Sequence, residues 1–421
     1  LSLLSHHPAR SVINAPSAHT ISRLSTQPPS TFVTSTNVMN FSALSDPEDL
    51  YRAIVRFEQR RPIVVIPSST PDPFDVIILQ ICSFGWDDFS VANVDMNPFF
   101  SQFDYIFTRF NSADSYSHTA AIRLLNGLCG LSDHEALFTS ISPQCNILET
   151  LRTQGYNTAT VFNHTGEYAN FTPLLTTAAH IDAPHDIGGL TTRRIGFDNS
   201  PIYSDFDALN EWLTTRTFSA TPEALFYNSI FLHAGNHYVD DAQWWKKSNE
   251  ENYANGLNTF TDSMTNFFDA LRKSNRRTIV LLVGEHGAGL RKTPFQLQTI
   301  REIPTPEISI VPAAIKLFGP GFNDRVTGLK IIDDRFISYQ GLYAALGSLL
   351  NTPPTSSAQS WHSRMSAIPE TPYFATGDRI TVVGTSSQFY YKSIDGEWRN
   401  LPASVNFPKV PLQKSSFTTF P

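Results

Sequence analysis

The chain has 421 residues, of which only 16% are charged, and its formal net charge is −7. A chain of this length can bury a large core and form one α/β domain with a tail. The negative charge and the absence of a basic stripe argue against a nucleic-acid partner, which normally needs a basic face. The longest apolar run, near residues 74–82, is far shorter than the roughly 18 residues of a membrane span. Because the chain begins with Leu1, we expect it to be a fragment or a processed product.

The N-terminal part of the sequence predicts a segment without core structure, then a helix and a buried strand. Residues 1–45 are rich in Ser, Thr, Pro and His and lack apolar periodicity, which predicts a linker or surface-wrapping segment. An acidic start and helical spacing predict a helix over 46–60. The apolar run FDVIILQIC, which ends at Cys82, is typical of a buried strand in a parallel sheet. In open α/β sheets, ligands bind at that end of the strands.

The stretch NSADSYSHTAAIRLLNGLCG, residues 111–130, follows an aromatic strand predicted over 103–110. It runs into an amphipathic helix that begins at Ser117. Free backbone N–H groups and the helix dipole favour an alkoxide and a phosphate oxygen at such a position, which suits a nucleophilic serine. The alternative is that Ser117 is only a helix N-cap, which is the more common role.

Strands and helices alternate along the rest of the chain. Helices are predicted over 146–156, 206–216, 250–273 and 338–350, and strands over 157–164, 224–238, 278–287 and 308–319. This alternation predicts an α/β fold with a mostly parallel central sheet and helices on both faces. After a Pro/Ser-rich break at 352–372, a turn at Asp395-Gly396 predicts a small C-terminal antiparallel hairpin, and residues 402–421 form a tail.

Residues suited to metal binding and nucleophilic attack follow four of the predicted strands. They are Cys82, then Ser117, then His233 and His237, and finally Glu285 and His286. Thiolate, carboxylate and imidazole are good Zn²⁺ ligands, and a catalytic zinc site keeps one position that a serine oxygen can fill. The metal would lower the pKa of that hydroxyl and so activate it. Each residue alone could be an ordinary core or loop residue, so the prediction rests on their coincidence at one sheet edge.

The chain has three cysteines, so one is left over if two pair. A bond between Cys129 and Cys145 would close a small loop and indicate an oxidising compartment, with Cys82 as the odd thiol. Three buried, reduced cysteines in a cytosolic protein are the alternative.

Several segments resemble the cellulose biosynthesis protein G family, the cellulose phosphoethanolamine transferases of the alkaline phosphatase/sulfatase superfamily. They include FDVIILQICSFGWDD, FDYIFTRFNSADSYSHTAAIRLL, IGFDNSPIYSD, HAGNHY, GEHGAGL and IREIPTPEISIVPAAIKLFG. The resemblance implies an alkaline phosphatase-like catalytic domain over 46–401 that binds one zinc ion. It implies a periplasmic domain of an inner-membrane protein, anchored by N-terminal segments absent from this chain. The implied donor is phosphatidylethanolamine, the acceptor is a glucose hydroxyl of cellulose, and the implied partner is the cellulose synthase complex.

The resemblance also implies roles for particular residues. Ser117 matches the nucleophile, Cys82, Glu285 and His286 match the zinc ligands, Tyr116, His233 and Arg301 match active-site residues, and Cys129 and Cys145 match the family's disulfide. The implied chemistry is a two-step phosphoryl transfer through a covalent intermediate on Ser117. His233, and less clearly His237, would exchange protons with the leaving and accepting oxygens. Arg301 would neutralise phosphoryl charge, or would instead pair with Glu302.

The sequence departs from the family pattern at three positions. His118, Ala234 and Gly284 stand where Gly, Asp and Pro are usual. An imidazole beside Ser117 could act as an extra base, shift the zinc geometry or narrow the acceptor site, so the acceptor is left open.

Two other classes of function fit the same sequence. A metal-dependent phosphatase or phosphodiesterase of the same superfamily would use water as the acceptor. A non-catalytic scaffold of the cellulose secretion machinery would bind glucan through aromatics such as Trp244, Trp245 and Trp361.

Overall fold

The computed structural model describes most of the chain. It covers residues 41–68, 73–138, 141–216, 221–322, 330–353, 358–385 and 388–402. Most of the expected linker, residues 1–40, and residues 403–421 of the expected tail lie outside the described residues. Within these limits, every helix is too short or too polar to cross a bilayer.

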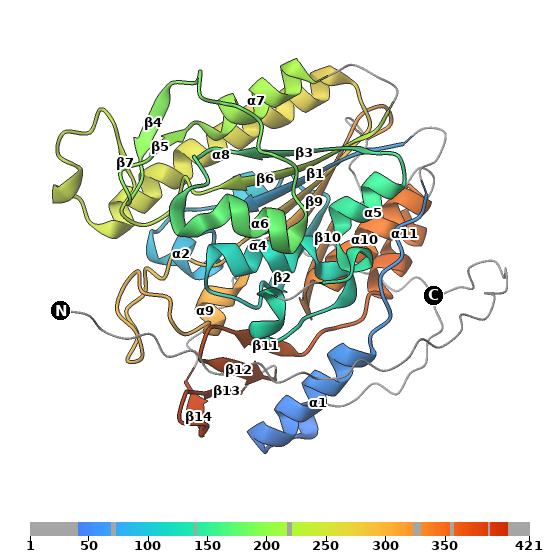
Figure 1. Cartoon of the computed structure of the whole chain (residues 1–421), viewed down its shortest axis with the longest axis vertical. Coiled ribbons are helices and arrows are strands. Elements are labelled where there is room, and N and C mark those ends of the chain that lie inside the picture. The colour runs from blue at the N-terminus through green and yellow to red at the C-terminus, as the bar shows by residue number, and fades with distance from the viewer. Residues whose placement is uncertain are drawn as a thin grey trace, which may run out of the picture. The chain divides into compact units, whose positions relative to one another are not determined.

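A seven-stranded sheet forms the centre of the described structure, in the order β10-β2-β9-β8-β1-β6-β3 (Figure 1). The strands are β1 (Asp75–Ile81), β2 (Tyr105–Asn111), β3 (Asn157–Phe162), β6 (Glu223–Ser229), β8 (Thr278–Gly284), β9 (Ile310–Phe318) and β10 (Ile331–Ile337). Within this sheet β9 alone runs antiparallel to its neighbours β2 and β8. The predicted mostly parallel α/β sheet is therefore confirmed.

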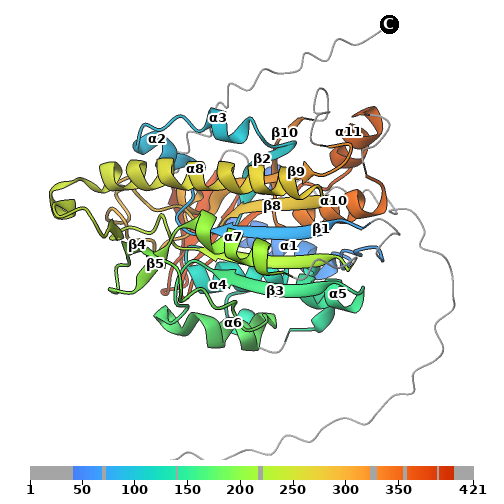
Figure 2. The same ribbon diagram turned by 90° about the horizontal axis from the view of Figure 1, so that it is seen from above.

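Helices cover both faces of this sheet (Figure 2). One face packs against α4 (Ser117–Leu125), α5 (Ile147–Thr153), α6 (Phe171–Ala179), α10 (Tyr339–Asn351) and α11 (Ala358–Ser366). The other packs against α2 (Trp86–Val91), α3 (Asn97–Phe100), α7 (Asp205–Thr215) and α8 (Asn249–Ser274). In β1, Val76 and Ile78 join the first core, whereas Ile77 and Leu79 join the second. Because successive side chains of a strand point to opposite faces, burial of both faces explains the continuous apolar run.

Two smaller sheets complete the described structure. Strands β11 (Tyr373–Thr376), β12 (Thr381–Gly384), β13 (Phe389–Lys392) and β14 (Trp398–Leu401) form an antiparallel sheet, which α1 (Pro47–Arg60) contacts. Strands β4 (Thr192–Ile195), β5 (Pro201–Tyr203) and β7 (His237–Tyr238) form the third sheet. The predicted C-terminal hairpin is present as β13 and β14, but it belongs to a larger sheet than we expected.

Among the elements that we did not predict, three have a weak local signal. The edge strand β10 has the sequence IIDDRFI, whose charged residues interrupt the apolar alternation. Helix α6, FTPLLTTAA, is rich in threonine and contains proline, both poor helix formers. Helix α11 lies inside the segment 352–372, where the Pro/Ser content predicted only a break.

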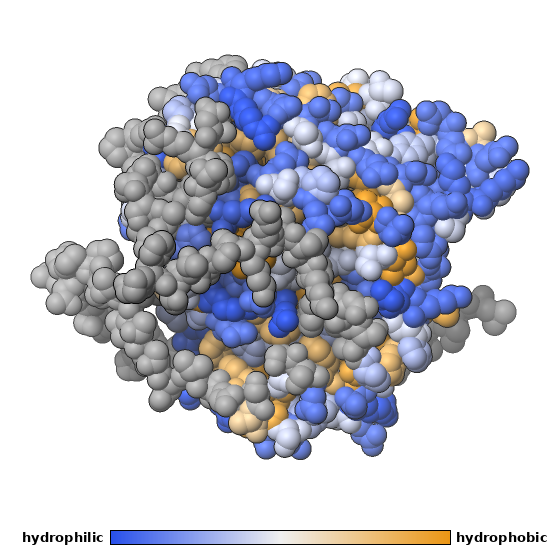
Figure 3. Space-filling model, turned by 180° about the vertical axis from the view of Figure 1, so that it is seen from behind, coloured by the Kyte–Doolittle hydropathy of each residue, from blue (hydrophilic) through white to orange (hydrophobic). Residues whose placement is uncertain are grey.

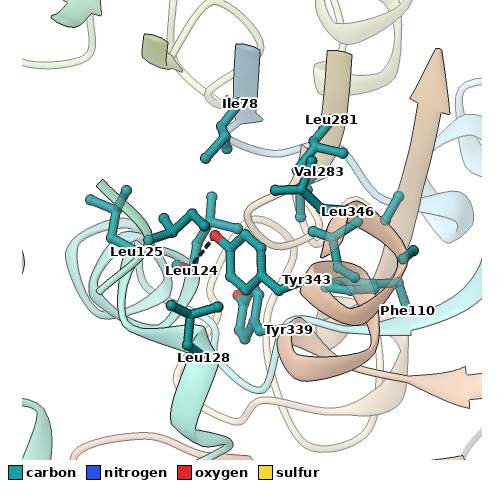
Figure 4. Close-up of a cluster of buried hydrophobic side chains, with 14 of the residues drawn as sticks. Ile78, Phe110, Leu124, Leu125, Leu128, Leu281, Val283, Tyr339, Tyr343 and Leu346 are labelled. Atoms are coloured by element: carbon teal, nitrogen blue, oxygen red, sulfur yellow. Dashed lines mark hydrogen bonds between the residues drawn. The ribbon is translucent and has the colours of Figure 1, made fainter. Parts of the chain in front are cut away.

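Helix α4 is packed tightly against α10 (Figure 4). Leu124 and Leu125 lie in the same buried cluster as Tyr339 and Tyr343, and the Tyr343 hydroxyl donates to the Leu124 carbonyl at 2.6 Å. A Cβ atom at Gly127 would meet the Cβ of Tyr339 at 2.5 Å, so the close approach requires glycine here. The helix that begins at Ser117 is thus fixed at its C-terminal end by the core.

The turn that enters α4 is held by a buried ion pair. One carboxylate oxygen of Asp114 accepts from the backbone N–H groups of Ser115 at 2.8 Å and Tyr116 at 3.1 Å. The other accepts from Arg123 Nε at 3.0 Å, and both charged side chains are at most 1% exposed. Arg123 also donates to the Ser132 carbonyl at 2.6 Å. One buried carboxylate therefore ties the turn to the helix that follows it.

The surface seen from behind is mainly hydrophilic and carries separate hydrophobic patches (Figure 3). The most exposed large hydrophobic side chains of the described residues are Val65, Leu297, Ile394 and Trp245. Scattered aliphatic residues on a surface are normal. Trp245 differs from the others because its large indole ring is 63% exposed.

We expect the Arg123→Met substitution to lower the free energy of unfolding by about 3–5 kcal/mol, because it leaves the Asp114 carboxylate buried and unpaired. Urea denaturation followed by circular dichroism measures this loss. The matched control is Arg52→Met, which removes a largely exposed partner of Glu48 and should cost less than about 1 kcal/mol. Equal losses in the two variants would contradict the role given to Asp114.

Candidate active site

The register of three neighbouring strands sets the framework of the site. Strand β1 lies between β6 and β8, and Ile81 is level with Ser229 on one side and Gly284 on the other. The ladder continues one residue further, where Cys82 N–H donates to the Ser229 carbonyl and Glu285 N–H donates to the Ile81 carbonyl. Cys82 and Glu285 therefore leave adjacent strands at the same level of the sheet.

Four side chains converge at this edge. The Ser117 Oγ atom lies 3.5 Å from Cys82 Sγ and 3.3 Å from His286 Nε2. Cys82 Sγ is 3.8 Å from His286 Nε2, and Glu285 Oε2 is 3.5 Å from the same nitrogen. The ligand atoms of Cys82, Glu285 and His286 all lie within 4.8 Å of one another, and all three residues are buried.

The geometry of this cluster fits a metal ion. His286 Nδ1 lies 2.8 Å from the Gly287 carbonyl, so Nδ1 carries the hydrogen and Nε2 presents a lone pair to the cluster. Glu285 Oε2 is buried and has no hydrogen-bond partner. A sulfur, a carboxylate oxygen and an imidazole nitrogen that face one another form a donor set suited to zinc.

Burial disfavours the charged forms of the side chains in this cluster. Burial raises the pKa of the Cys82 thiol to about 12 and also raises the pKa of the Glu285 carboxyl. Burial and the nearby Arg301 cation lower the pKa of His286 well below its ordinary value. A cation that bound here would displace protons from the thiol and the carboxyl, which couples metal affinity to pH.

A second layer of polar residues orients Glu285. Asn228 Nδ2 donates to Glu285 Oε1 at 3.1 Å, and its own carbonyl oxygen accepts from His164 Nε2 at 3.0 Å. The Gly166 N–H donates to His164 Nδ1 at 3.0 Å, which fixes the tautomer. We did not predict Asn228 or His164 as site residues, although an asparagine inside the buried strand ALFYNS is a signal that could have been used.

Arg301 presents unpaired hydrogen-bond donors to the same region. Its Nη2 atom lies 3.3 Å from His233 Nε2, whereas Nε and Nη1 are buried without a partner. Among the described residues Arg301 forms no ion pair, so the predicted alternative of a salt bridge with Glu302 is absent there. A buried guanidinium with free donors is suited to an anion such as a phosphate.

His233 is held in its neutral form. Its Nδ1 atom lies 2.7 Å from the Ala234 carbonyl and therefore carries the hydrogen, so Nε2 is the acceptor for Arg301. Burial first, and then the Arg301 cation, lower the pKa of His233 to about 3. At neutral pH the Nε2 atom of this imidazole therefore carries no proton that it could donate.

Ser117 is the first residue of α4 and does not cap it. Tyr116 occupies the N-cap position, and no side chain makes a capping hydrogen bond there. Tyr116 is half-buried, and burial, followed by the nearby Glu302 carboxylate, raises the pKa of its hydroxyl. His118 follows Ser117, and its half-buried ring lies 6.3 Å from that of Tyr116. The backbone N–H groups of this first turn lack intrahelical partners, and they lie beside the Ser117 hydroxyl.

Two residues that we named for catalysis or for glucan binding, His237 and Trp361, lie outside the cluster around Ser117. His237 belongs to β7 and stacks on Trp244, with ring centroids 4.2 Å apart, and it is not part of the cluster around Ser117. Trp361 is only 1% exposed, so the expectation that it binds glucan was wrong. It fills a core position on α11, and its helix was not predicted.

Tyr168 joins the site without any signal in the sequence. Its hydroxyl is buried and has no hydrogen-bond partner. Burial, then the neighbouring Glu285 and Cys82, raise the pKa of this hydroxyl well above its ordinary value. Its ring stacks on Phe171 and meets Phe197 edge-on, and Phe197 in turn stacks on His233.

The remaining cysteines are joined. Cys129 and Cys145 form a disulfide with their Cα atoms 5.0 Å apart, which leaves Cys82 as the free thiol of the chain. The disulfide connects the end of the α4 segment with the turn that precedes α5.

Gly284, which stands where the family pattern has proline, lies in a closely packed part of the backbone. A Cβ atom at Gly284 would meet the Phe84 carbonyl oxygen at 2.5 Å and Val311 Cβ at 2.8 Å. The backbone immediately before Glu285 is therefore packed too closely for a side chain.

Comparisons with known proteins agree with this fold. The family described as cellulose biosynthesis protein BcsG C-terminal domain matches residues 35–398. The BcsG protein of Escherichia coli K12 is 31% identical over 342 residues, which cover 80% of this chain and 60% of that protein. The chain thus spans about 60% of the length of this relative.

Solved structures show the same fold at lower identity. A protein of the alkaline phosphatase superfamily from Vibrio parahaemolyticus has a TM-score of 0.58 and 17% identity, covering 83% of this chain and 86% of that one. The zinc complex of the C-terminal periplasmic domain of EcEptC from Escherichia coli has a TM-score of 0.53 and 14% identity, covering 75% and 93%. The fold is therefore alkaline phosphatase-like. Because the family match extends over most of the chain, this protein belongs to the cellulose biosynthesis protein BcsG family.

Proposed function

We propose that this domain is a zinc-dependent phosphoethanolamine transferase that acts through a covalent intermediate on Ser117. The observation that carries the proposal is the meeting of the Ser117 hydroxyl with three ligand atoms beside a buried arginine that has two unpaired donors. A nucleophile, a cation site and an anion site are the parts that phosphoryl transfer requires. Family membership and the zinc complex of the similar EcEptC domain support the same chemistry.

In the first step, Ser117 Oγ attacks the phosphorus of phosphatidylethanolamine. A bond forms between the serine oxygen and phosphorus, the bond to the diacylglycerol oxygen breaks, and the serine proton leaves with diacylglycerol. Arg301 holds the phosphoryl oxygens through Nε and Nη1, and the first N–H groups of α4 add further donors. Cys82, Glu285 and His286 would hold one zinc ion, which would lower the pKa of the serine hydroxyl and offset phosphoryl charge.

In the second step, a glucose hydroxyl of cellulose attacks the phosphorus and releases Ser117. The acceptor hydroxyl gives its proton to the neutral Nε2 atom of His233, and His233 passes this proton to the serine oxygen as the bond between that oxygen and phosphorus breaks. Because His233 is configured as a proton acceptor, we assign it to this step and not to protonation of the diacylglycerol oxygen. The rival hydrolase would run the same first step with water in place of the sugar.

The cellular setting is part of the proposal. We infer a periplasmic domain of an inner-membrane protein that works with the cellulose synthase complex and reaches its lipid donor through N-terminal segments outside this chain. The Cys129–Cys145 disulfide supports an oxidising compartment. The name of the family supports the link to cellulose synthesis.

The first prediction concerns the intermediate. We expect the zinc-loaded protein, incubated with a nitrophenyl ester of phosphoethanolamine, to gain one phosphoethanolamine adduct in intact-mass spectra, because Ser117 is the attacking group. Ser117→Ala should gain none, and Cys82→Ala should lose both zinc and adduct. Ser115→Ala is the matched control, since its hydroxyl has no hydrogen-bond partner and lies two residues away.

The outcomes separate the three classes of function. No zinc and no adduct on the folded protein would favour the scaffold. An adduct that passes only to water, even with cello-oligosaccharides present, would favour the hydrolase.

The second prediction concerns Arg301. We expect Arg301→Gln to slow adduct formation by about 10²–10³-fold, because the phosphoryl oxygens lose a preorganised donor pair. Stopped-flow release of nitrophenol measures this step. Arg301→Lys keeps the charge without the planar fork and should recover only part of the rate. A rate unchanged in Arg301→Gln would remove this residue from the mechanism.

The third prediction concerns pH. Since burial and the Arg301 cation both disfavour the imidazolium, we expect His233 to stay neutral as the pH falls from about 7.5 to about 5. Histidine-selective NMR follows the ring, and the signal missing from His233→Gln identifies it. In Arg301→Gln the pKa should rise but stay below its ordinary value, because burial is the larger cause. A midpoint near the ordinary value of about 6.5 in the unsubstituted protein would contradict this assignment.

A further inference from the structure

A pocket of about 210 Å³ opens beside His233. It lies between the loop that follows β6, the short helix Trp244–Lys246 and the start of α8. We call it the tryptophan pocket and define it by Trp244, Trp245, Asn249, Asn252 and His233. We propose that it binds one neutral sugar residue of the glucan acceptor, an inference that rests on the transferase function proposed above.

The aromatic wall of the tryptophan pocket is already in place. Trp244 is stacked on His237, with ring centroids 4.2 Å apart and planes 13° apart. Trp245 stands nearly perpendicular to Trp244 and is 63% exposed. An indole is a large, rigid, apolar surface with few rotamers to lose, so it binds a flat apolar ring face at low entropic cost. The C–H faces of a β-linked glucose ring offer such a surface.

The polar wall consists of amides. Asn252 Nδ2 donates to the Trp244 carbonyl at 3.4 Å, and Asn249 Nδ2 donates to Gln298 Oε1 at 3.2 Å. These contacts orient the two side chains, and each amide retains a carbonyl oxygen that can accept a hydrogen bond. A group that both donates and accepts matches the hydroxyl groups of a sugar, which do the same.

The charges around the pocket disfavour binding of the phosphoethanolamine group of the donor. No acidic side chain of the described residues lines it, so it offers no counter-ion to the ethanolammonium group. Its two cations are already engaged: Arg194 donates to the carbonyls of Phe231 and Asn236, and Lys247 pairs with Asp241 at 2.5 Å. A neutral ligand is the one that this pocket fits.

The size and place of the pocket fit the second step of the reaction. At about 30 Å³ per water molecule, it has room for roughly seven waters, which is the scale of one sugar ring. His233 lines it, and the Nε2 atom of His233 is in contact with Arg301, the proposed phosphoryl clamp. His233 therefore connects the tryptophan pocket with Arg301, and a hydroxyl of a sugar bound here would lie next to the imidazole that we propose as its proton acceptor.

The test uses binding, so that it does not depend on turnover. Cellohexaose is titrated by calorimetry into the zinc-loaded full chain carrying Ser117→Ala. We expect saturable binding that Trp245→Ala weakens at least tenfold and Asn249→Ala at least threefold. Ile394→Ala is the control, because it truncates a similarly exposed hydrophobic residue outside the pocket and should leave the affinity unchanged. Both test residues are exposed, so the variants should fold.

Each possible result of these titrations either supports or overturns the proposed sugar site. Absence of cellohexaose binding, or binding that neither Trp245→Ala nor Asn249→Ala weakens, would overturn the proposal. Loss of affinity for O-phosphoethanolamine in Trp245→Ala, with cellohexaose unaffected, would also overturn it and assign the pocket to the donor. Cellohexaose binding that is sensitive to Trp245, in a protein that forms no adduct on Ser117, would support the glucan site and refute the transferase.

Discussion

The buried contact between Asp114 and Arg123 is the constraint on which the position of Ser117 depends. The carboxylate of Asp114 binds the backbone just before Ser117 and the side chain of Arg123 two turns later, so the turn and the helix cannot move separately. Removing two charges from water costs free energy, so this ion pair adds little net stability. Its role here is to hold the turn and the helix in one geometry. The tight contact of α4 with α10 fixes the other end of the same helix (Figure 4). The Ser117 hydroxyl is thereby aimed at Cys82 and His286 by the core and not by a flexible loop.

The cation site depends on strand register in the same way. Cys82 and Glu285 come from adjacent parallel strands, and backbone hydrogen bonds continue past the last ladder pair to hold both residues level. A slip of one residue would turn each side chain to the opposite face of the sheet. Asn228, from the strand on the other side of β1, completes the arrangement by bonding to Glu285. Three strands thus position the side chains of the site. Side chains held by strands are positioned more precisely than side chains held by loops alone.

Parts of this arrangement could be predicted from sequence, and others could not. The apolar run before Cys82 and the pattern around Ser117 are local signals, and parallel strands bring such residues to one edge, so the sheet and the candidate cluster followed from them. Strand β10 and helices α6 and α11 are stabilised by tertiary packing against the core, which local propensity does not contain. Tyr168 reaches the site through a turn whose path depends on how its ring packs against Phe171 and Phe197. The scaffold alternative includes Trp361 among the glucan-binding aromatics, because a tryptophan in a Pro/Ser-rich segment gives no sign that it is buried.

The unpaired polar atoms of the site give the strongest physical reason to expect a ligand. Glu285 Oε2, two nitrogens of Arg301 and the Tyr168 hydroxyl are buried without hydrogen bonds, and all three residues act electrostatically on one another. Each such atom costs about 1–3 kcal/mol, or more when charged, unless something binds it. A carboxylate oxygen needs a cation, whereas guanidinium and phenol groups need an acceptor, so no single ion satisfies all of them. A cation together with a phosphate-like anion does, and this pair is what a metal-dependent phosphoryl transfer brings to the site. These unpaired atoms therefore lower the stability of the fold, and binding of a cation and a phosphate-like anion would restore it.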